Sequence, residues 1–256
     1  MKQLSLEQIS FYRRHGYLIV EDFLAPLETK EYAHEAQLLV NHCYELGDLV
    51  SHWGCIVEPL GCDYLEPREI PPQARTARHA YIAVRSQISS AALALCTLDR
   101  FGRCARQLLS SGPAYLLNDQ YIVKPPRCES ACFAWHQDTM YFSPAEQCHE
   151  VVSVWVPLDD VSEDNGTVLV EPFPDPERPG VYEGRERAGV FAAAISAGTA
   201  LFMDGRLRHC SVANRSPAFR TAYMPQFSLG RIQRLPDSSA GGTERHTAFA
   251  VPLSDD

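Results

Sequence analysis

Two histidines and one aspartate are the residues of this sequence whose types and spacing best suit chemistry. His136 and Asp138 stand two residues apart in Trp135-His136-Gln137-Asp138, an apolar and aromatic run that is typical of a strand. Side chains two residues apart on a strand point to the same face, so this imidazole and this carboxylate are expected to project together. By itself the pattern is weak evidence, because a polar pair at the end of a strand is the more common explanation.

A later segment supplies a third candidate ligand. Residues 204–211 read Asp-Gly-Arg-Leu-Arg-His-Cys-Ser, which predicts a turn and then a strand that carries His209. Residues 213–217 (Ala-Asn-Arg-Ser-Pro) predict a hairpin loop that leads into a strand with Arg220. In such a hairpin Arg220 lies across from Ser211, one pleat beyond His209.

These residues together point to one kind of metal chemistry. Two histidines and one carboxylate on one face of a metal leave three positions open, and non-haem Fe(II) uses this arrangement to bind a bidentate oxo-acid and O2. A guanidinium is the natural bidentate partner for the far carboxylate of that oxo-acid. The sequence therefore predicts an Fe(II) site made of His136, Asp138 and His209, with Arg220 and Ser211 beside it.

The first half of the chain reads as helical. Ser5 and Gln8 form a capping box and Gly16 ends the segment, so residues 6–15 predict a short helix. Residues 26–46 predict a long amphipathic helix, because apolar residues recur there at spacings of 4, 3, 4 and 3. A third helical stretch covers roughly residues 89–109.

The second half reads as β structure. Residues 17–20 are an early strand candidate, and after residue 114 short β-type runs alternate with turn residues. These runs are residues 115–123, 132–142, 151–158, 167–171, 189–195, 199–203, 208–212 and 219–227. About eight strands at such spacing predict a β-sandwich or barrel with the helices packed outside.

We expect a single domain over residues 1–235, followed by a mobile or extended tail over residues 236–256. The irregular residues 51–78 are expected to form a loop that shapes a substrate pocket.

With these residues in hand, the chain resembles the phytanoyl-CoA dioxygenase family, which includes the ectoine hydroxylases, over nearly its whole length. Residues 11–24 are similar to the opening of that family, in which a phenylalanine precedes a glycine-tyrosine pair and a short apolar run. Further segments follow in the order of the family: Asn118 to Pro126, Trp135 to Asp138, Trp155 to Asp160, Asn165-Gly166, and His209-x-Ser211 with Arg220 eleven residues after His209.

The resemblance implies roles for nine residues. His136, Asp138 and His209 match the iron ligands, and Arg220 and Ser211 match the residues that hold the distal carboxylate of 2-oxoglutarate. Four further positions are expected to line or approach the same pocket: Phe133, which packs on the cosubstrate in ectoine hydroxylases, Trp155, and Gln120 and Lys124, which face either cosubstrate or substrate.

The resemblance also implies a fold and a reaction. The fold is a double-stranded β-helix, a cupin-like jelly roll that is mainly β with flanking α-helices. The reaction uses Fe(II), 2-oxoglutarate and O2, releases succinate and CO2, and hydroxylates a small or medium organic substrate, expected to belong to natural-product metabolism. Desaturation, ring formation and epimerisation use the same machinery and stay open as outcomes.

Two interpretations from other classes compete with this one. A non-catalytic jelly-roll protein would bind a small molecule or metal without turnover, but the presence of all three ligands with Arg220 and Ser211 argues against it. A cupin-like metalloenzyme that works without 2-oxoglutarate has no need of a carboxylate anchor such as Arg220.

A basic cluster in the first half of the chain also allows two interpretations. Arg75, Arg78, Tyr81 and Arg85 stand close together in an otherwise acidic sequence. We favour structural ion pairs or a solvated face. The alternative is a patch that attracts an anionic substrate.

Composition limits the partners and the location. A formal net charge of −9 argues against nucleic acid, because phosphate binding needs a basic surface. Residues 1–25 lack the apolar core of a signal peptide and no 18-residue apolar run follows, so we expect a cytoplasmic protein without a membrane anchor, either a monomer or a homodimer. The nine cysteines form no CxxC pair and are expected to be free thiols.

Overall fold

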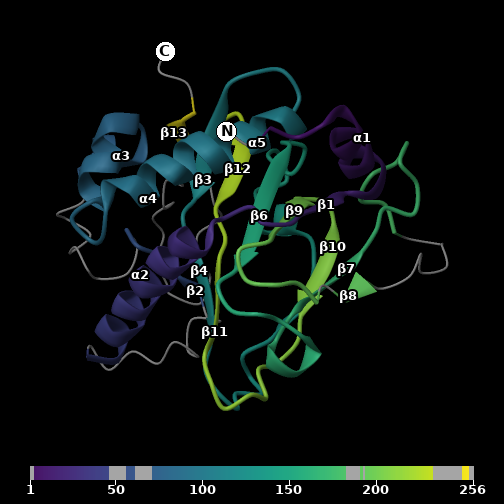
Figure 1. The fold of residues 1–256 in the computed structure, drawn as a ribbon. Coiled ribbons are helices and arrows are strands. Elements are labelled where there is room, and N and C mark those ends of the chain that lie inside the picture. Colours follow the sequence, from purple (N-terminus) through teal and green to yellow (C-terminus); the bar gives the residue numbers. More distant parts are fainter. Residues whose placement is uncertain are drawn as a thin grey trace.

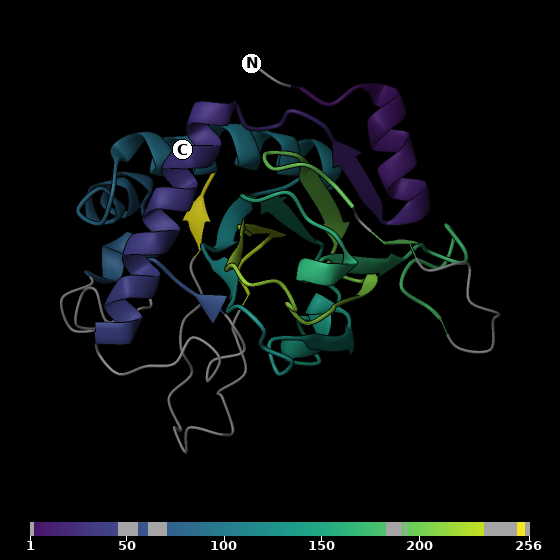
Figure 2. The ribbon, with the colours of Figure 1, turned by 60° about the horizontal axis from the view of Figure 1, so that its bottom comes forward.

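The protein is a mainly β jelly roll whose helices lie on the outside. The computed structural model describes residues 3–45, 56–60, 71–182, 191–192, 194–232 and 250–253. Their strands form two antiparallel sheets that curl around a common interior, while the helices cover the outer face of the larger sheet (Figures 1 and 2). The predicted fold class is confirmed.

The larger sheet runs in the order β13-β3-β12-β6-β11-β4-β2, with β9 pairing to β6 and β1 to β9. Its strands are β1 Tyr17–Val20, β2 Ile56–Val57, β3 Ala114–Asn118, β4 Tyr121–Lys124, β6 Val151–Pro157, β9 Ala200–Asp204, β11 Arg220–Tyr223, β12 Gln226–Leu229 and β13 Val251–Pro252. The smaller sheet runs in the order β5-β10-β7-β8. Its strands are β5 Phe133–His136, β7 Val168–Glu171, β8 Phe191–Ala192 and β10 Arg208–Ser211.

The helices come mostly from the first half of the chain, as predicted. They are α1 Leu6–His15, α2 Pro26–Glu45, α3 Arg78–Arg85, α4 Ala91–Cys96 and α5 Gly102–Leu108, with a π-helical turn at Thr97–Phe101 between α4 and α5. Short 3-10 turns lie at η2 Pro72–Arg75, η4 Asp138–Tyr141 and η5 Glu163–Asn165. The capping box at Ser5 and the left-handed Gly16 at the end of α1 are both present. No helix in the described ranges is long and apolar enough to cross a membrane.

Strands β6 and β9 of the larger sheet are buried on both faces, and each face packs into a different hydrophobic cluster. On β6, Val152, Val154 and Val156 pack in the cluster that holds the helices, whereas Trp155 belongs to the cluster between the two sheets. The same alternation on β9 places Phe202 toward the helices, whereas Leu201 and Met203 face the interior between the two sheets. This period of two decides which side chains reach the interior, where a site can form.

A buried ionic cluster ties the helices to the sheet. Arg85 of α3 is fully buried and donates to Glu35 of α2 at 2.8 Å and to Asp119 at 2.7 Å. The Asp119 carboxylate, in the turn between β3 and β4, also accepts from the hydroxyls of Tyr81 and Tyr223 at 2.6 and 2.7 Å. Arg85 and Tyr81 therefore play the structural role that we favoured for the basic cluster.

Several boundaries differ from the sequence prediction. The run 115–123 is two strands, and so is 219–227, where Pro225 lacks the amide hydrogen that a continuing ladder needs. Part of the irregular region 51–78 forms β2 and η2, while residues 51–55 and 61–70 lie outside the described residues. Of the predicted tail, residues 250–253 are described, and β13 pairs with β3. The structure shows no disulfide between cysteines of the described ranges.

The predicted hairpin between the strands of His209 and Arg220 is wrong. β10 pairs with β5 and β7, whereas β11 pairs with β4 and β6, so the two strands belong to different sheets. The physical reason is that β11 lies between β4 and β6 and forms hydrogen bonds with both. If β11 paired with β10 in a local hairpin, β4 and β6 would lose this shared partner.

Replacing Arg85 with Met is expected to lower the free energy of unfolding by about 3–5 kcal/mol, because the change leaves two buried carboxylates without their cation. Chemical denaturation followed by circular dichroism measures this loss. The control is Arg215→Met, which removes a largely exposed ion pair to Glu129 and is expected to cost less than about 1 kcal/mol. A loss at Arg85 no larger than the loss at Arg215 would contradict the structural role of the cluster.

Candidate metal centre and cavity

His136 and Asp138 come together, but not in the way that the strand pattern predicts. β5 ends at His136, and Asp138 is the first residue of the 3-10 turn η4. The two side chains therefore do not project from one strand. The turn instead brings the carboxylate back toward the imidazole, with Asp138 Oδ1 at 3.6 Å from His136 Nε2.

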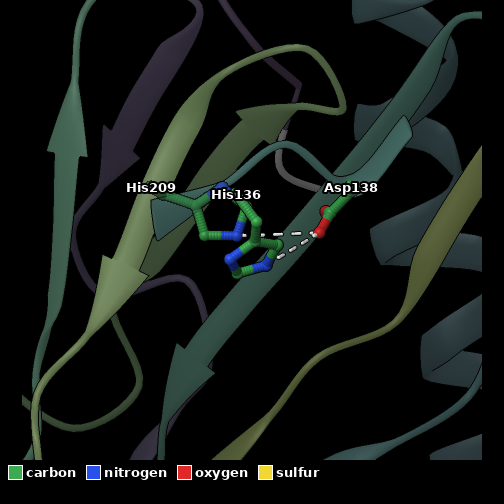
Figure 3. Close-up of side chains that lie close together, drawn as sticks. All are labelled: His136, Asp138 and His209. Carbon is green, nitrogen blue, oxygen red and sulfur yellow. Dashed lines mark ion pairs between the residues drawn. The ribbon is translucent and has the colours of Figure 1, made fainter. Parts of the chain in front are cut away.

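His209 completes the group from the neighbouring strand. It lies on β10 directly opposite His136 in the β5–β10 register, and the two imidazole rings are 4.2 Å apart between centroids. His209 Nε2 is also 3.6 Å from Asp138 Oδ1. One ligand atom from each residue lies within 4.8 Å of the others, and Figure 3 shows the three side chains converging.

Both imidazoles are held in the form that a metal requires. His136 Nδ1 lies 2.7 Å from the carbonyl oxygen of Ala134, and His209 Nδ1 lies 3.0 Å from that of Leu207. A carbonyl only accepts, so each Nδ1 carries the proton and donates it. Each Nε2 is then the ring nitrogen that faces Asp138 and is left for a metal, as in metal-binding histidines that are fixed by an outer hydrogen bond.

The electrostatics of the group favour an ionised carboxylate. Burial raises the pKa of Asp138, but the nearby imidazoles and the Ser153 hydroxyl outweigh it and lower that pKa to about 2. Burial lowers the pKa of His209 despite the attraction of Asp138, which favours its neutral form. For His136, burial is outweighed by the hydrogen bond and charge of Asp138, so its pKa is raised.

The donor set fits a divalent transition metal. Two neutral imidazole nitrogens and one carboxylate oxygen on one side are the ligands of the facial triad, and they leave the other side open. Within the described ranges this is the one group of three or more potential ligands of this kind close enough to share an ion.

The triad opens into a cavity of about 660 Å³ between the two sheets. Five other predicted site residues line it: Gln120, Phe133, Trp155, Ser211 and Arg220. A cavity of this size suits a small organic molecule, for which pockets of roughly 300–1,000 Å³ are usual.

Arg220 and Ser211 reach this cavity from opposite sheets. Arg220, on β11, is buried, donates to the carbonyl oxygen of Ile122 at 3.2 Å and has its guanidinium 5.6 Å from the centre of the Trp155 ring. Ser211 lies on β10, two residues after His209. The two side chains that were predicted as neighbours in a hairpin therefore face one cavity across the jelly roll.

Lys124 lies behind Ser211. It stands opposite Arg220 in the β4–β11 register and is fully buried. Its ammonium donates to Ser211 Oγ at 2.8 Å and to the carbonyl oxygens of Ala131 and Val212 at 2.7 and 2.5 Å. Gly166, at φ 95°, leaves room for this chain, since a Cβ there would lie 2.7 Å from Lys124 Cδ.

Comparison with known families identifies the chain. The model of the family described as phytanoyl-CoA dioxygenase matches residues 12–222. The chain belongs to the phytanoyl-CoA dioxygenase family. This confirms the resemblance seen in the motifs. No curated protein sequence matches the chain.

Solved structures with the same fold share little sequence with this family member. The epimerase SnoN, in complex with Fe3+, alpha ketoglutarate and nogalamycin RO, is 21% identical with a TM-score of 0.64, covering 98% of this chain and 95% of its own. EvdO2 from Micromonospora carbonacea var. aurantiaca, complexed with 2-oxoglutarate, is 17% identical with a TM-score of 0.59, covering 91% and 94%. The carbocyclase SnoK from nogalamycin biosynthesis is 19% identical with a TM-score of 0.56, covering 99% and 94%.

Three polar residues at this site were not singled out by the motifs. Ser153 and Gln226 both donate to Asp138 Oδ2, and Asn118 donates to Gln226. One sequence feature could have drawn attention to Ser153, because it is a single polar residue in an otherwise apolar strand, Val-Val-Ser-Val-Trp. The sequence does not show what this residue contacts.

Other candidates have clear positions. Met140, Tyr141 and Phe142, which follow the ligands, line the cavity, and Met140 and Tyr141 are exposed at its edge. Three further residues of the irregular region 51–78 that could contact substrate, His52, Trp53 and Tyr64, lie outside the described residues.

Replacing His209 with Ala is expected to weaken the binding of Fe(II) or Co(II) by more than roughly 100-fold. Loss of a hydrogen-bond partner of a ligand already costs up to about that factor, and loss of the ligand itself should cost more. Anaerobic titration of the metal measures the dissociation constant. The control is His149→Ala, because His149 contacts the carbonyl oxygen of Leu229 away from the triad. Equal metal affinity in the His209 variant and the wild type would show that the ion is bound elsewhere.

Proposed function

We propose that this chain is a non-haem Fe(II)- and 2-oxoglutarate-dependent oxygenase that hydroxylates an unactivated C–H bond of a small or medium organic substrate, in natural-product metabolism. The observation that carries the proposal is the presence of the His136–Asp138–His209 triad and the buried Arg220 in one cavity. A metal triad alone suits many reactions. A buried guanidinium in the same cavity specifies an anionic cosubstrate.

Fe(II) is the metal that this donor set would hold, and 2-oxoglutarate is the anion that matches the remaining residues. When bound together, they supply the oxidative decarboxylation that yields succinate and CO2 and activates O2. Arg220 would hold the distal carboxylate, because its charge is shielded from water and oriented by the Ile122 carbonyl and the Trp155 ring. Anaerobic conditions allow this complex to be observed without turnover.

Ser211 would be a second donor to the same carboxylate. Its oxygen accepts a hydrogen bond from Lys124, so its own proton is available for an acceptor in the cavity. Lys124 thereby orients Ser211 and adds a buried positive charge behind it. Phe133 and Trp155 line the cavity near these groups and limit the access of water to the cosubstrate.

The substrate would enter from the edge formed by Met140 and Tyr141. These side chains are exposed and belong to the same 3-10 turn as Asp138, so a molecule resting on them would lie beside the metal. The Tyr141 ring is 5.7 Å from the His136 ring between centroids. Gln120, 95% buried and lining the same cavity, offers an amide donor and an acceptor to a polar group of cosubstrate or substrate.

Epimerisation or ring closure is the second candidate outcome. It is favoured by the similarity of the fold to SnoN and SnoK, whose names state those activities. The presence of the carboxylate ligand Asp138 leaves no additional position for a halide, which argues against halogenation, and hydroxylation is our first choice among the remaining outcomes. Mass spectrometry of the product formed with labelled O2 distinguishes these outcomes. Hydroxylation adds one labelled oxygen atom to the product, whereas epimerisation and ring closure add none.

The proposal is tested by adding Fe(II) and 2-oxoglutarate to the protein without oxygen. We expect a weak visible charge-transfer band, since the keto and C1 carboxylate oxygens would chelate the metal. Admission of O2 should then yield succinate. Absence of the band in folded protein that binds Fe(II) would refute the cosubstrate and leave the metal site standing.

Replacing Arg220 with Ala is expected to raise the 2-oxoglutarate concentration that half-saturates the band by at least about 10-fold. Hydrogen bonds to charged groups contribute roughly 1.5–3 kcal/mol, which corresponds to that factor or more. Fe(II) affinity should stay unchanged. The control is Arg208→Ala on β10 of the smaller sheet, whose side chain pairs with Glu171 and lies over the Trp135 ring outside the cavity. An unchanged requirement in the Arg220 variant would place the anchor elsewhere.

A further inference from the structure

The two oxygens of the Asp138 carboxylate have different surroundings. Oδ1 faces both imidazoles at 3.6 Å. Oδ2 faces away from them and accepts two hydrogen bonds, from Ser153 Oγ at 2.5 Å and from Gln226 Nε2 at 2.9 Å. One oxygen is therefore presented to the ligand group while the other is occupied by protein donors.

The direction of every hydrogen bond around Oδ2 follows from the ionised carboxylate. Because Asp138 only accepts, Ser153 must donate its hydroxyl proton to it, and the Ser153 oxygen in turn accepts from Gln226 Nε2 at 2.8 Å. The amide nitrogen of Gln226 thus uses both its protons on this side. Its oxygen must then point the other way, where it accepts from Asn118 Nδ2.

These three donors form a row on neighbouring strands of the larger sheet. Gln226 of β12 stands opposite Ser153 of β6 and opposite Asn118 of β3 in the register. A register shift after Gln226 marks a bulge in β3, which turns Asn118 to the interior face. All three side chains are more than 90% buried, so water competes little for their hydrogen bonds.

The row compensates for the way in which Asp138 is attached. His136 and His209 are held by their own paired strands, whereas Asp138 lies beyond the end of β5 in a 3-10 turn. A carboxylate in that position can rotate about its last bond, since the turn does not fix it. The opposite sheet supplies the missing constraint.

We propose that Ser153 and Gln226 are positioning residues that hold Asp138 as a ligand through Oδ1 alone, with Asn118 fixing the amide of Gln226. This inference rests on the metal site proposed above but not on 2-oxoglutarate. A carboxylate held in this way occupies one coordination position rather than two. The positions that cosubstrate and O2 require are then left open.

The test compares metal binding by five proteins without 2-oxoglutarate and without oxygen: the wild type, Ser153→Ala, Gln226→Met, the double variant that carries both changes, and the control Ser228→Ala. Ser228 is, like Ser153, a buried serine of the larger sheet, and it lies on β12. Its hydroxyl donates to the carbonyl oxygen of Gly230 at 2.8 Å, away from the triad. The control therefore removes a comparable buried hydroxyl from the same sheet. Each protein is titrated with Fe(II) and, for its visible spectrum, with Co(II).

We expect Ser153→Ala and Gln226→Met each to raise the metal dissociation constant about 10–100-fold, the usual cost of losing a ligand's hydrogen-bond partner. The visible absorption of bound Co(II), which reports coordination number, should change in both. The double variant should lose less than the product of the two factors, because both residues act on one oxygen. Ser228→Ala should match the wild type in affinity and spectrum.

Wild-type affinity and an unchanged Co(II) spectrum in both Ser153→Ala and Gln226→Met would overturn the inference while leaving the proposed function intact. Equal weakening in Ser228→Ala would also overturn it, because the effect would then reflect general stability. If one variant fails to fold, the other decides the question. Failure of the wild type to bind either metal would refute the metal site itself and this inference with it.

Discussion

The site depends on the packing of the smaller sheet against the larger one across the interior of the jelly roll. The two histidines come from β5 and β10 of the smaller sheet, where their strands pair directly. Arg220 and the residues that hold Asp138 come from the larger sheet. The distance between the sheets therefore sets the distance between the metal and every group that orients the carboxylate or the cosubstrate.

That distance is held by apolar packing on one side and by buried charges on the other. Trp155 and Met203 of the larger sheet pack with Val168 and Val170 of the smaller sheet. Behind the larger sheet, Arg85 joins Asp119 to the helices. Asp119 stands between Asn118 and Gln120, which both line the cavity, so this outer cluster also steadies the turn that carries them.

The polar groups of the interior divide into two sets. Arg220 and Ser211 line the cavity, and the Lys124 ammonium donates to Ser211 from behind. Asn118, Ser153 and Gln226 form a closed set of hydrogen bonds around one carboxylate oxygen. The fold is shared with an epimerase and a carbocyclase, so the fold alone does not select the outcome of the reaction.

Much of the fold could be predicted from the sequence, because its signals are local. The capping box at Ser5, the spacing of apolar residues in α2 and the alternation of short β-type runs each depend on neighbours within a few residues. Strand ends were less predictable. Asp138 was expected on a strand, yet the backbone turns immediately after His136, and no residue nearby signals that change.

The sequence by itself determined which residues are candidate ligands and which is the candidate anchor, since His136, Asp138, His209 and Arg220 stand out by type, order and spacing. Only the tertiary structure decided how they meet. Arg220 and Ser211 face one cavity from different sheets rather than across a hairpin, because strand partners are chosen by long-range pairing. Ser153 and Gln226 became part of the site for the same reason: they are 73 residues apart in the chain and are brought together by the register of β6 and β12.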